Sequence, residues 1–374
     1  MAGYVWIDTP SALTEMLARL SDEPLVAVDT ESDSLHVYFE KVCLVQLSIP
    51  GVDYLVDPLR VDIQPLGDLF ASEAQEKVFH AAEYDIMCLK RDYGFTFAHL
   101  FDTMIAARVL GWKRFGLADI LETHLNVHLD KRLQRFNWGI RPLPESALEY
   151  ASNDSRYLLP LRELQLSQLQ ARGRLEEARQ AFRRQTRIGA NYRSFDPEGF
   201  WRLVGARQLE PTQQSVLRQL YILRDELARE LDLPPFKVIA NAVLVRLAQV
   251  CPNSRRSLVQ VRGLSHRVRK DYADRLLQAI HDGCRARPPV EPIHMHARMS
   301  DQVVTRYQAL RAWRKEAAAV RQVDPDVILP NHVLKELARC SPVTADALTQ
   351  LATLDDWQRQ SYGEELLRVL RKTS

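Results

Sequence analysis

Cysteine is scarce in this sequence, with five among 374 residues. The five are odd in number, widely scattered and never arranged as C-x-x-C, so the sequence indicates neither a disulfide framework nor a zinc site. Glycine-rich phosphate-binding motifs are also missing, because neither G-x-x-x-x-G-K nor G-x-G-x-x-G occurs. An ATP-driven role is therefore disfavoured, and no nucleotide cofactor is expected.

Long apolar runs are absent too. No segment offers the roughly eighteen uninterrupted apolar residues of a membrane span, and Met1–Asp8 lacks a basic stretch followed by an apolar run. Hydrophobic residues make up 46% and charged residues 26%, the balance of a soluble globular protein. We therefore expect a cytoplasmic protein with no membrane contact, and the length favours two or three domains.

The charge is distributed unevenly along the chain. Residues 1–100 hold 17 acidic against 6 basic side chains, whereas residues 101–374 hold 31 against 44. An acidic segment joined to a basic remainder is expected where carboxylates hold cations and distant surfaces meet a polyanion.

Short β-branched runs alternate with helical patterns over the first two hundred residues. This alternation is typical of an α/β domain with a central sheet. The expected strands cover residues 25–29, 42–48, 54–57 and 77–80. The expected helices cover residues 11–20, capped by Ser11, and residues 145–170, where leucines recur at helical spacing.

From about residue 200 the pattern changes to helices only, and the chain repeats itself. A shift of 90 residues pairs identical side chains without a gap, among them Arg224 with Arg314, Asn241 with Asn331 and Tyr272 with Tyr362. Two copies of one helical domain explain this match. Residues 285–292 between the copies are rich in proline, which opposes helix formation, so a linker is expected there.

Asp29 and Glu31 flank Thr30 at the carboxyl end of an expected strand. Residues i and i+2 of a strand point to the same side, so both carboxylates could reach one metal ion. Hydrolysis of phosphodiesters by two divalent cations needs several convergent carboxylates, because hard cations prefer oxygen ligands. The alternative for this pair alone is a solvated strand end.

Two further acids lie on expected helices. Asp85 follows His80 just beyond a strand, and a surface acid favoured by the helix dipole would look the same. Tyr150 and Asp154 are four residues apart and so share a helix face, where they could hold and deprotonate or orient an attacking water. The alternative is a half-buried tyrosine with Asp154 paired to Arg156 or another basic neighbour.

In this order and spacing, Asp29-Thr-Glu31, Asp85 after His80, and Tyr150-x-x-x-Asp154 resemble the three motifs of the DEDD exonucleases, tyrosine subclass. Residues 129–131, 137–138 and 141–143 are similar to the ribonuclease D branch in particular. The ninety-residue repeat resembles the paired HRDC domains that follow the nuclease in that branch, so the resemblance covers nearly the whole chain.

The resemblance implies an α/β ribonuclease H-like exonuclease domain followed by two all-α HRDC helical domains. The expected boundaries are residues 1–195 for the exonuclease domain, 206–286 for the first HRDC domain, 287–298 for the linker and 299–374 for the second HRDC domain. It also implies that Asp29, Glu31, Asp85 and Asp154 bind two divalent metal ions, Mg²⁺ or Mn²⁺, and that Tyr150 positions the nucleophilic water. Asp102 is expected to be a structural acid.

The activity implied by the resemblance is that of a 3′–5′ exoribonuclease, which hydrolyses RNA 3′ ends to 5′-mononucleotides by a two-metal-ion mechanism. The implied partner is RNA with a free 3′ end, such as a tRNA precursor in 3′ maturation, and the protein is expected to be a monomer. Two alternatives stay open at this point, a DNA-directed 3′–5′ exonuclease and a catalytically silent RNA-binding adaptor. The four intact acids argue against the adaptor.

Basic side chains form two clusters that could neutralise RNA phosphates. One follows the expected catalytic helix and includes Arg172, Arg174, Arg179, Arg183, Arg184 and Arg187. The other lies in the first repeat and supplies the predicted nucleic-acid contacts, Arg255, Arg256, Arg262, Arg267, Arg269 and Lys270. A merely solvated arginine face is the alternative for either cluster. In the second repeat the turn around Thr353–Trp357 is less basic than the turn around Arg262–His266, so we expect this copy to pack or space rather than to bind RNA.

The sequence departs from the family pattern at two positions. Ser32 stands where many relatives carry an aromatic residue that can press on the terminal nucleotide, and Ala81 stands where some carry asparagine. Neither position is a predicted metal ligand. The departure at Ser32 leaves open how the last base is held.

Overall fold

The computed structural model describes residues 3–192, 194–291 and 300–373. The chain divides into two compact units. One unit comprises residues 1–32, 42–191 and 296–374, and the other comprises residues 33–41 and 192–295. The predicted linker, residues 287–298, lies outside the described residues from Pro292 onward. Among the helices of the described segments, none is long and apolar enough to cross a lipid bilayer.

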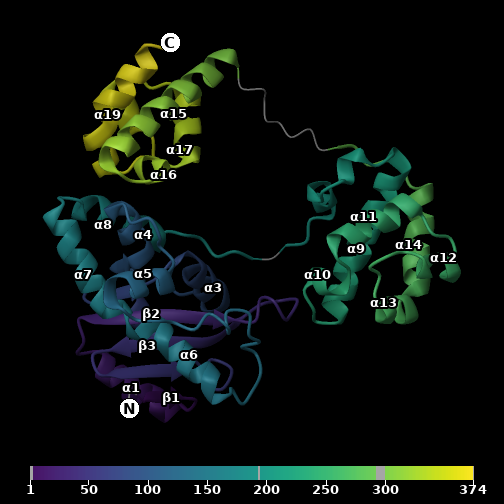
Figure 1. The fold of residues 1–374 in the computed structure, drawn as a ribbon, viewed down its shortest axis with the longest axis horizontal. Helices are drawn as coiled ribbons and strands as arrows, with labels where there is room; N and C mark the ends of the chain where they lie inside the picture. Colours follow the sequence, from purple (N-terminus) through teal and green to yellow (C-terminus); the bar gives the residue numbers. More distant parts are fainter. Residues whose placement is uncertain (1–2, 193, 292–299, 374) are drawn as a thin grey trace. The chain divides into compact units, whose positions relative to one another are not determined.

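A six-stranded mixed sheet forms the centre of the first unit (Figure 1). Its strands are β1 (Tyr4–Ile7), β2 (Leu25–Ser32), β3 (Val42–Ile49), β4 (Val52–Val56), β5 (Glu76–Phe79) and β6 (Leu100–Asp102), in the order β1-β4-β3-β2-β5-β6. Strand β3 runs antiparallel to both its neighbours, and the other pairs are parallel. The predicted central sheet is confirmed, and β1 and β6 at its two edges are additional.

Eight helices accompany the sheet in the described part of residues 3–191. They are α1 (Pro10–Leu20), α2 (Leu66–Ala71), α3 (Glu83–Tyr93), α4 (Thr103–Leu110), α5 (Leu117–Leu125), α6 (Glu145–Arg156), α7 (Leu158–Ala171) and α8 (Leu175–Thr186). The predicted cap at Ser11 is wrong. The Thr9 hydroxyl accepts the hydrogen bond from the Ala12 amide at 3.3 Å, which leaves Pro10 at the first helical position, where its missing N–H costs nothing.

The single helix predicted over residues 145–170 is also wrong, because the structure has two helices that meet at Tyr157. Pro160 explains the break. A proline inside a helix lacks the amide that would bond to the carbonyl of residue i−4, and its ring clashes with that carbonyl, which here belongs to Arg156. Pro160 is tolerated because it lies in the first turn of α7. Helix α6 packs across β2, β3 and β4, and α7 packs against α4 and β5.

The second unit is helical, apart from the segment 33–41. Its elements are the 3₁₀ helices η1 (Pro197–Arg202) and η2 (Ala206–Gln208) and the helices α9 (Pro211–Glu230), α10 (Pro235–Val238), α11 (Asn241–Val250), α12 (Arg255–Val259), α13 (His266–Asp271) and α14 (Ala273–Arg285). Tyr38 is buried in its core, and the phenol donates to the Asp225 carboxylate at 2.7 and 2.8 Å.

Residues 300–373 of the first unit fold in the same way. Their helices are α15 (Asp301–Arg321), α16 (Pro325–Ile328), α17 (Asn331–Cys340), α18 (Ala345–Thr349) and α19 (Asp356–Arg371). Helices α16, α17 and α18 each begin ninety residues after α10, α11 and α12. The two helical copies predicted from the sequence are therefore confirmed.

Candidate active site

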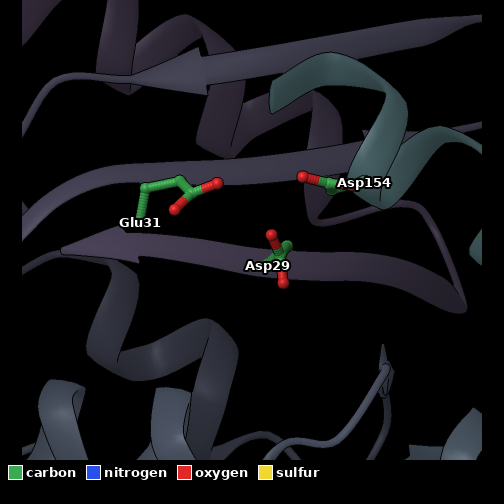
Figure 2. Close-up of side chains that lie close together, drawn as sticks. All are labelled: Asp29, Glu31 and Asp154. Atoms are coloured by element: carbon green, nitrogen blue, oxygen red, sulfur yellow. The ribbon is translucent and has the colours of Figure 1, made fainter. Parts of the chain in front are cut away.

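Three carboxylates converge beside β2. One oxygen each from Asp29, Glu31 and Asp154 lies within 4.8 Å of the other two. Asp29 and Glu31 project from the same side of β2, and Asp154 faces them from α6 (Figure 2). The alternation of side chains along a strand explains the first pair, and the packing of α6 across β2 brings the third.

Asp85 lies next to this group without belonging to it. The residue is buried in the first turn of α3, and its carboxylate accepts a hydrogen bond from the Thr30 hydroxyl at 2.5 Å. Thr30 therefore links α3 to the segment of β2 that carries Asp29 and Glu31. The charge of Asp85 contributes to the raised pKa of both these residues, which shows that the four acids share one electrostatic environment.

Burial and mutual repulsion govern the protonation of the four acids. Burial, followed by the neighbouring carboxylates, raises the pKa of Asp29 and of Glu31 well above the usual range. Burial also raises the pKa of Asp85 and of Asp154 to about 7 in each case. Four carboxylates held together in this way disfavour full ionisation unless a cation compensates them. Their oxygen ligands fit hard divalent cations such as Mg²⁺ or Mn²⁺.

Tyr150 lies one turn before Asp154 on α6. Burial, followed by the charges of Asp154, Glu31 and Asp29, raises the pKa of the phenol. The phenol therefore keeps its proton at neutral pH, so it is suited to orienting a water rather than to removing its proton. The alternative in which Arg156 neutralises Asp154 is not realised, because Arg156 pairs with Asp53 at 2.6 Å.

Asp102 holds the turn that leads into α3. The carboxylate caps α4 by accepting from the amides of Met104 and Ile105, and it also accepts from the amides of Ala81 and Ala82 at 3.2 and 2.9 Å. Ala81 has a left-handed backbone with φ 61°, so this turn needs such support. Asp102 is thus a structural acid, as the sequence indicates.

His80 shows no sign of a metal-binding role. Burial lowers the pKa of its imidazole to about 4, so the ring is neutral, and its Nδ1 lies 2.9 Å from the Thr103 hydroxyl. The ring is therefore engaged with the same turn that Asp102 supports.

Tyr84 was not among the site residues predicted from the sequence. Its side chain is 41% exposed, directly before Asp85 in α3, and its hydroxyl lies 3.0 Å from the hydroxyl of Ser32. An exposed aromatic ring thus lies beside the position where the family aromatic residue is missing. The signal in the sequence was weak, because a single tyrosine at the start of a helix has no pattern of its own.

The six predicted RNA contacts lie on the surface of the second unit, in α12, in α13 and in the segment between them. Half of them are engaged locally: Arg255 pairs with Asp274 at 2.6 Å, Arg267 with Asp271 at 4.0 Å, and Arg269 donates to the Val259 carbonyl at 3.2 Å. Arg256, Arg262 and Lys270 are exposed. Surface ion pairs of this kind are weak and can be exchanged for a phosphate.

Comparisons with known proteins agree with this architecture. A family model described as 3′–5′ exonuclease matches residues 4–169, and a model described as HRDC domain matches residues 213–280 and 304–370. Ribonuclease D of Acidiphilium cryptum is 29% identical over 374 residues, covering 98% of this chain and 92% of its relative.

Two RRP6 proteins are similar over a smaller share. Exosome complex exonuclease RRP6 of Saccharomyces cerevisiae is 33% identical over 75% of this chain, and the chain spans 40% of its length. The crystal structure of the catalytic core of RRP6 from Trypanosoma brucei matches with a TM-score of 0.69 and 28% identity, covering 75% of this chain and 79% of that one. With a 3′–5′ exonuclease domain followed by two HRDC domains, and with full-length similarity to ribonuclease D, the chain belongs to the ribonuclease D family of 3′–5′ exoribonucleases.

Proposed function

We propose that this exoribonuclease hydrolyses RNA by a two-metal-ion mechanism in which Asp29, Glu31, Asp85 and Asp154 hold the ions. The convergence of three carboxylate oxygens within 4.8 Å, with Asp85 adjacent, is the observation that carries the proposal. When bound, divalent cations would polarise the scissile phosphate and stabilise the attacking and leaving oxygens. The raised pKa values of the four acids support this role. They reflect the cost of holding several negative charges in a buried place, and a bound cation would compensate those charges.

In this proposal Tyr150 orients the attacking water. The protonated phenol can donate one hydrogen bond, and Asp154 lies within reach of the same water or of the phenol itself. Trp138 supports the ring from the core side, with the two ring centroids 6.0 Å apart. Tyr150→Phe is therefore expected to slow turnover by roughly a hundredfold, the usual loss for such a group, while the demand for metal stays unchanged.

We further propose that Tyr84 provides the aromatic face for the terminal nucleotide that Ser32 cannot provide. Stacking of a base on an aromatic side chain contributes about 1–3 kcal/mol. Tyr84→Ala should raise KM for short RNA without removing turnover, and Tyr84→Phe, which keeps the ring, should behave like the parent.

The proposed substrate is RNA with a free 3′ end, including tRNA precursors, acted on by a monomer that releases 5′-mononucleotides. Arg255, Arg256, Arg262, Arg267, Arg269 and Lys270 would contribute affinity for the body of such an RNA.

Substitution of the acids tests the mechanism. Asp29→Asn and Asp154→Asn should each lower kcat by at least about a thousandfold, because each removes a ligand for cations that stabilise the transition state by several kcal/mol. RNA binding should persist. The matched control is Asp22→Asn, an exposed acid that precedes β2 and is not one of the four. Activity within a few-fold of the parent in either site variant would contradict the assignment.

Without metal, the stability of the protein should depend on pH. The folded-state pKa values of Asp85 and Asp154 are raised to about 7, so the stability they contribute is present below their unfolded pKa and is lost as pH rises through about 7. The Tm of protein treated with a chelator should therefore fall between about pH 4 and pH 7. Added Mg²⁺ or Mn²⁺ should remove most of that fall, because bound cations favour the ionised carboxylates. A Tm that responds to neither pH nor metal would contradict the proposed ligand set.

A further inference from the structure

A cavity of about 540 Å³ lies in the exonuclease part of the chain, away from the four acids. Its walls come from the amino ends of β5 and β6 and from α7 and α8, and they include Glu76, His99, Arg162, Arg179, Arg183 and Arg187. The acids lie at the opposite, carboxyl ends of the parallel strands β2 and β5. The cavity is therefore not part of the candidate active site.

Arginines dominate one rim of this cavity. Arg179, Arg183 and Arg187 are spaced by four residues along α8 and its C-terminal cap, so they share one helix face. All three are exposed. Within the described segments, neither Arg183 nor Arg187 has a carboxylate within 4.0 Å, and Arg179 reaches only Glu176, at 4.0 Å. Arg183 and Arg187 therefore have no ion-pair partner in these segments, and Arg179 has only this long contact.

On the opposite face of α8 the charged side chains form ion pairs within the protein. There Arg184 forms an ion pair with Asp355, and the buried Glu177 pairs with Arg321, both partners coming from residues 300–373. The chain thus neutralises one charged face of α8 with its own side chains, whereas Arg183 and Arg187 on the other face have no ion pair in the described segments.

Two carboxylates, Glu73 and Glu76, line the cavity, and within the described segments neither forms an ion pair with the three arginines of the rim. Glu76 is already paired with Arg162 at 2.7 Å and lies 3.3 Å from the His99 ring. Arg162 in turn stacks over the Phe101 ring at 5.5 Å, and Phe101 packs on Phe182 to form an aromatic floor. The cavity therefore combines a cationic rim with a rigid apolar base.

We propose that this cavity binds the phosphodiester backbone of the RNA upstream of the 3′ end that is being cleaved. The inference rests on the proposed RNA substrate and adds a contact that guides it. Guanidinium groups in a row at one rim suit successive phosphates, which they can bind bidentately. Glu76 of the cavity pairs with Leu25 of β2, and Asp29 and Glu31 lie four and six residues further along that strand, which corresponds to about 13–20 Å or roughly four to six stacked nucleotides. Very short RNA cannot reach both places.

The test uses the double variant Arg183→Gln/Arg187→Gln in the full-length protein. Its matched control is Arg19→Gln/Arg60→Gln, which removes the same charge from two exposed arginines that do not line the cavity. Binding is measured against salt with a hairpin RNA carrying a single-stranded 3′ tail, in a background of Asp29→Asn to prevent cleavage. The cavity variant should bind roughly tenfold more weakly, and its slope of log affinity against log salt should fall by about 1.4, or about 0.7 for each lost phosphate contact.

Turnover of a trinucleotide separates this inference from the proposed function. The cavity variant with Asp29 intact should cleave the trinucleotide at the parental rate, because that substrate does not reach the cavity. If the parent itself cleaves no RNA, the proposed function fails, whereas the binding loss would still support the cavity. An unchanged affinity and slope for the hairpin RNA, or an equal loss in the control variant, would overturn the cavity assignment.

Discussion

The two helical repeats share a buried core and differ on their surfaces. In each, an arginine of the long first helix is buried and fixed in the same way. Arg224 donates to the Ile239 carbonyl at 3.0 Å and to the Asn241 side chain at 2.7 Å. Arg314, ninety residues later, donates to the Leu329 carbonyl at 2.6 Å and to the Asn331 side chain at 2.9 Å. This hydrogen-bond network is therefore a shared structural feature of the two repeats.

Of the six basic surface positions in the first repeat, one is maintained as a basic residue in the second. The residues ninety positions after the six predicted RNA contacts are Ala345, Asp346, Ala352, Trp357, Arg359 and Gln360. Around this turn the second repeat uses its side chains within its own unit instead: Asp355 pairs with Arg184, and Trp357 lies under the Arg321 guanidinium at 5.3 Å. The expectation that the second repeat packs is thus confirmed. The comparison of the two repeats shows that the same buried core can carry a surface used for contacts within the protein or an exposed basic surface.

The largest effect is expected from breaking what the repeats share. Arg224→Met and Arg314→Met should each cost about 2–4 kcal/mol of the free energy of unfolding of the repeat that carries it, since a buried carbonyl and amide lose a charged donor. Amide hydrogen exchange in the full-length protein resolves the two repeats, through α9 and α11 in one case and α15 and α17 in the other. A loss confined to one of the two variants would contradict the common role of the arginine.

A smaller effect should come from the open basic surface. Arg256→Gln/Arg262→Gln/Lys270→Gln should weaken binding to structured RNA and lower the salt slope by about 2, with trinucleotide cleavage unchanged. Lys335→Gln/Arg339→Gln/Lys372→Gln removes the same charge from exposed positions of the second repeat and should change the slope little. Equal slopes in the two triple variants would remove the functional distinction between the repeats.

The smallest effect should come from transferring the basic surface. Ala352→Arg/Gln360→Lys places basic residues at the positions in the second repeat that match Arg262 and Lys270. Both positions are exposed, so folding should not suffer. RNA affinity should rise only about twofold to threefold, because Asp346 and Asp356 keep the surrounding surface acidic. A gain in RNA affinity as large as the loss caused by the triple variant of the first repeat would show that the basic charges determine binding regardless of the surrounding residues.

The sequence predicted the parts of the fold that have a strong periodic signal. Strands β2 and β3 are long and apolar, and the ninety-residue match required no structure to see. Strand β1 was missed because its side chains at the sheet edge are mostly only partly buried or exposed, and β6 was missed because three residues are too few for a pattern. The helix over residues 145–170 was drawn too long because the leucine spacing continues through the break that Pro160 imposes.

The candidate site was predicted from the order and spacing of its acids, which tertiary packing then brings together. Proximity of Asp154 to Asp29 and Glu31 could not be derived from the sequence, because it depends on how α6 crosses the sheet. The protonated state of Tyr150 and the exposure of Tyr84 beside Ser32 also depend on neighbours distant in sequence. The cavity was hidden for the same reason, since its arginines were visible as a basic run but its walls come from four separate elements.

Pro160 gives the break at Tyr157 a meaning beyond chain geometry. Because of this break, one continuous stretch of sequence contributes to two places. Helix α6 places Tyr150 and Asp154 beside the other acids, and α7 places Arg162 in the wall of the cavity. An unbroken helix has a single axis and could not follow both directions. The break that Pro160 imposes therefore places the candidate active site and the proposed RNA-binding cavity on two separate helices of one continuous stretch of sequence.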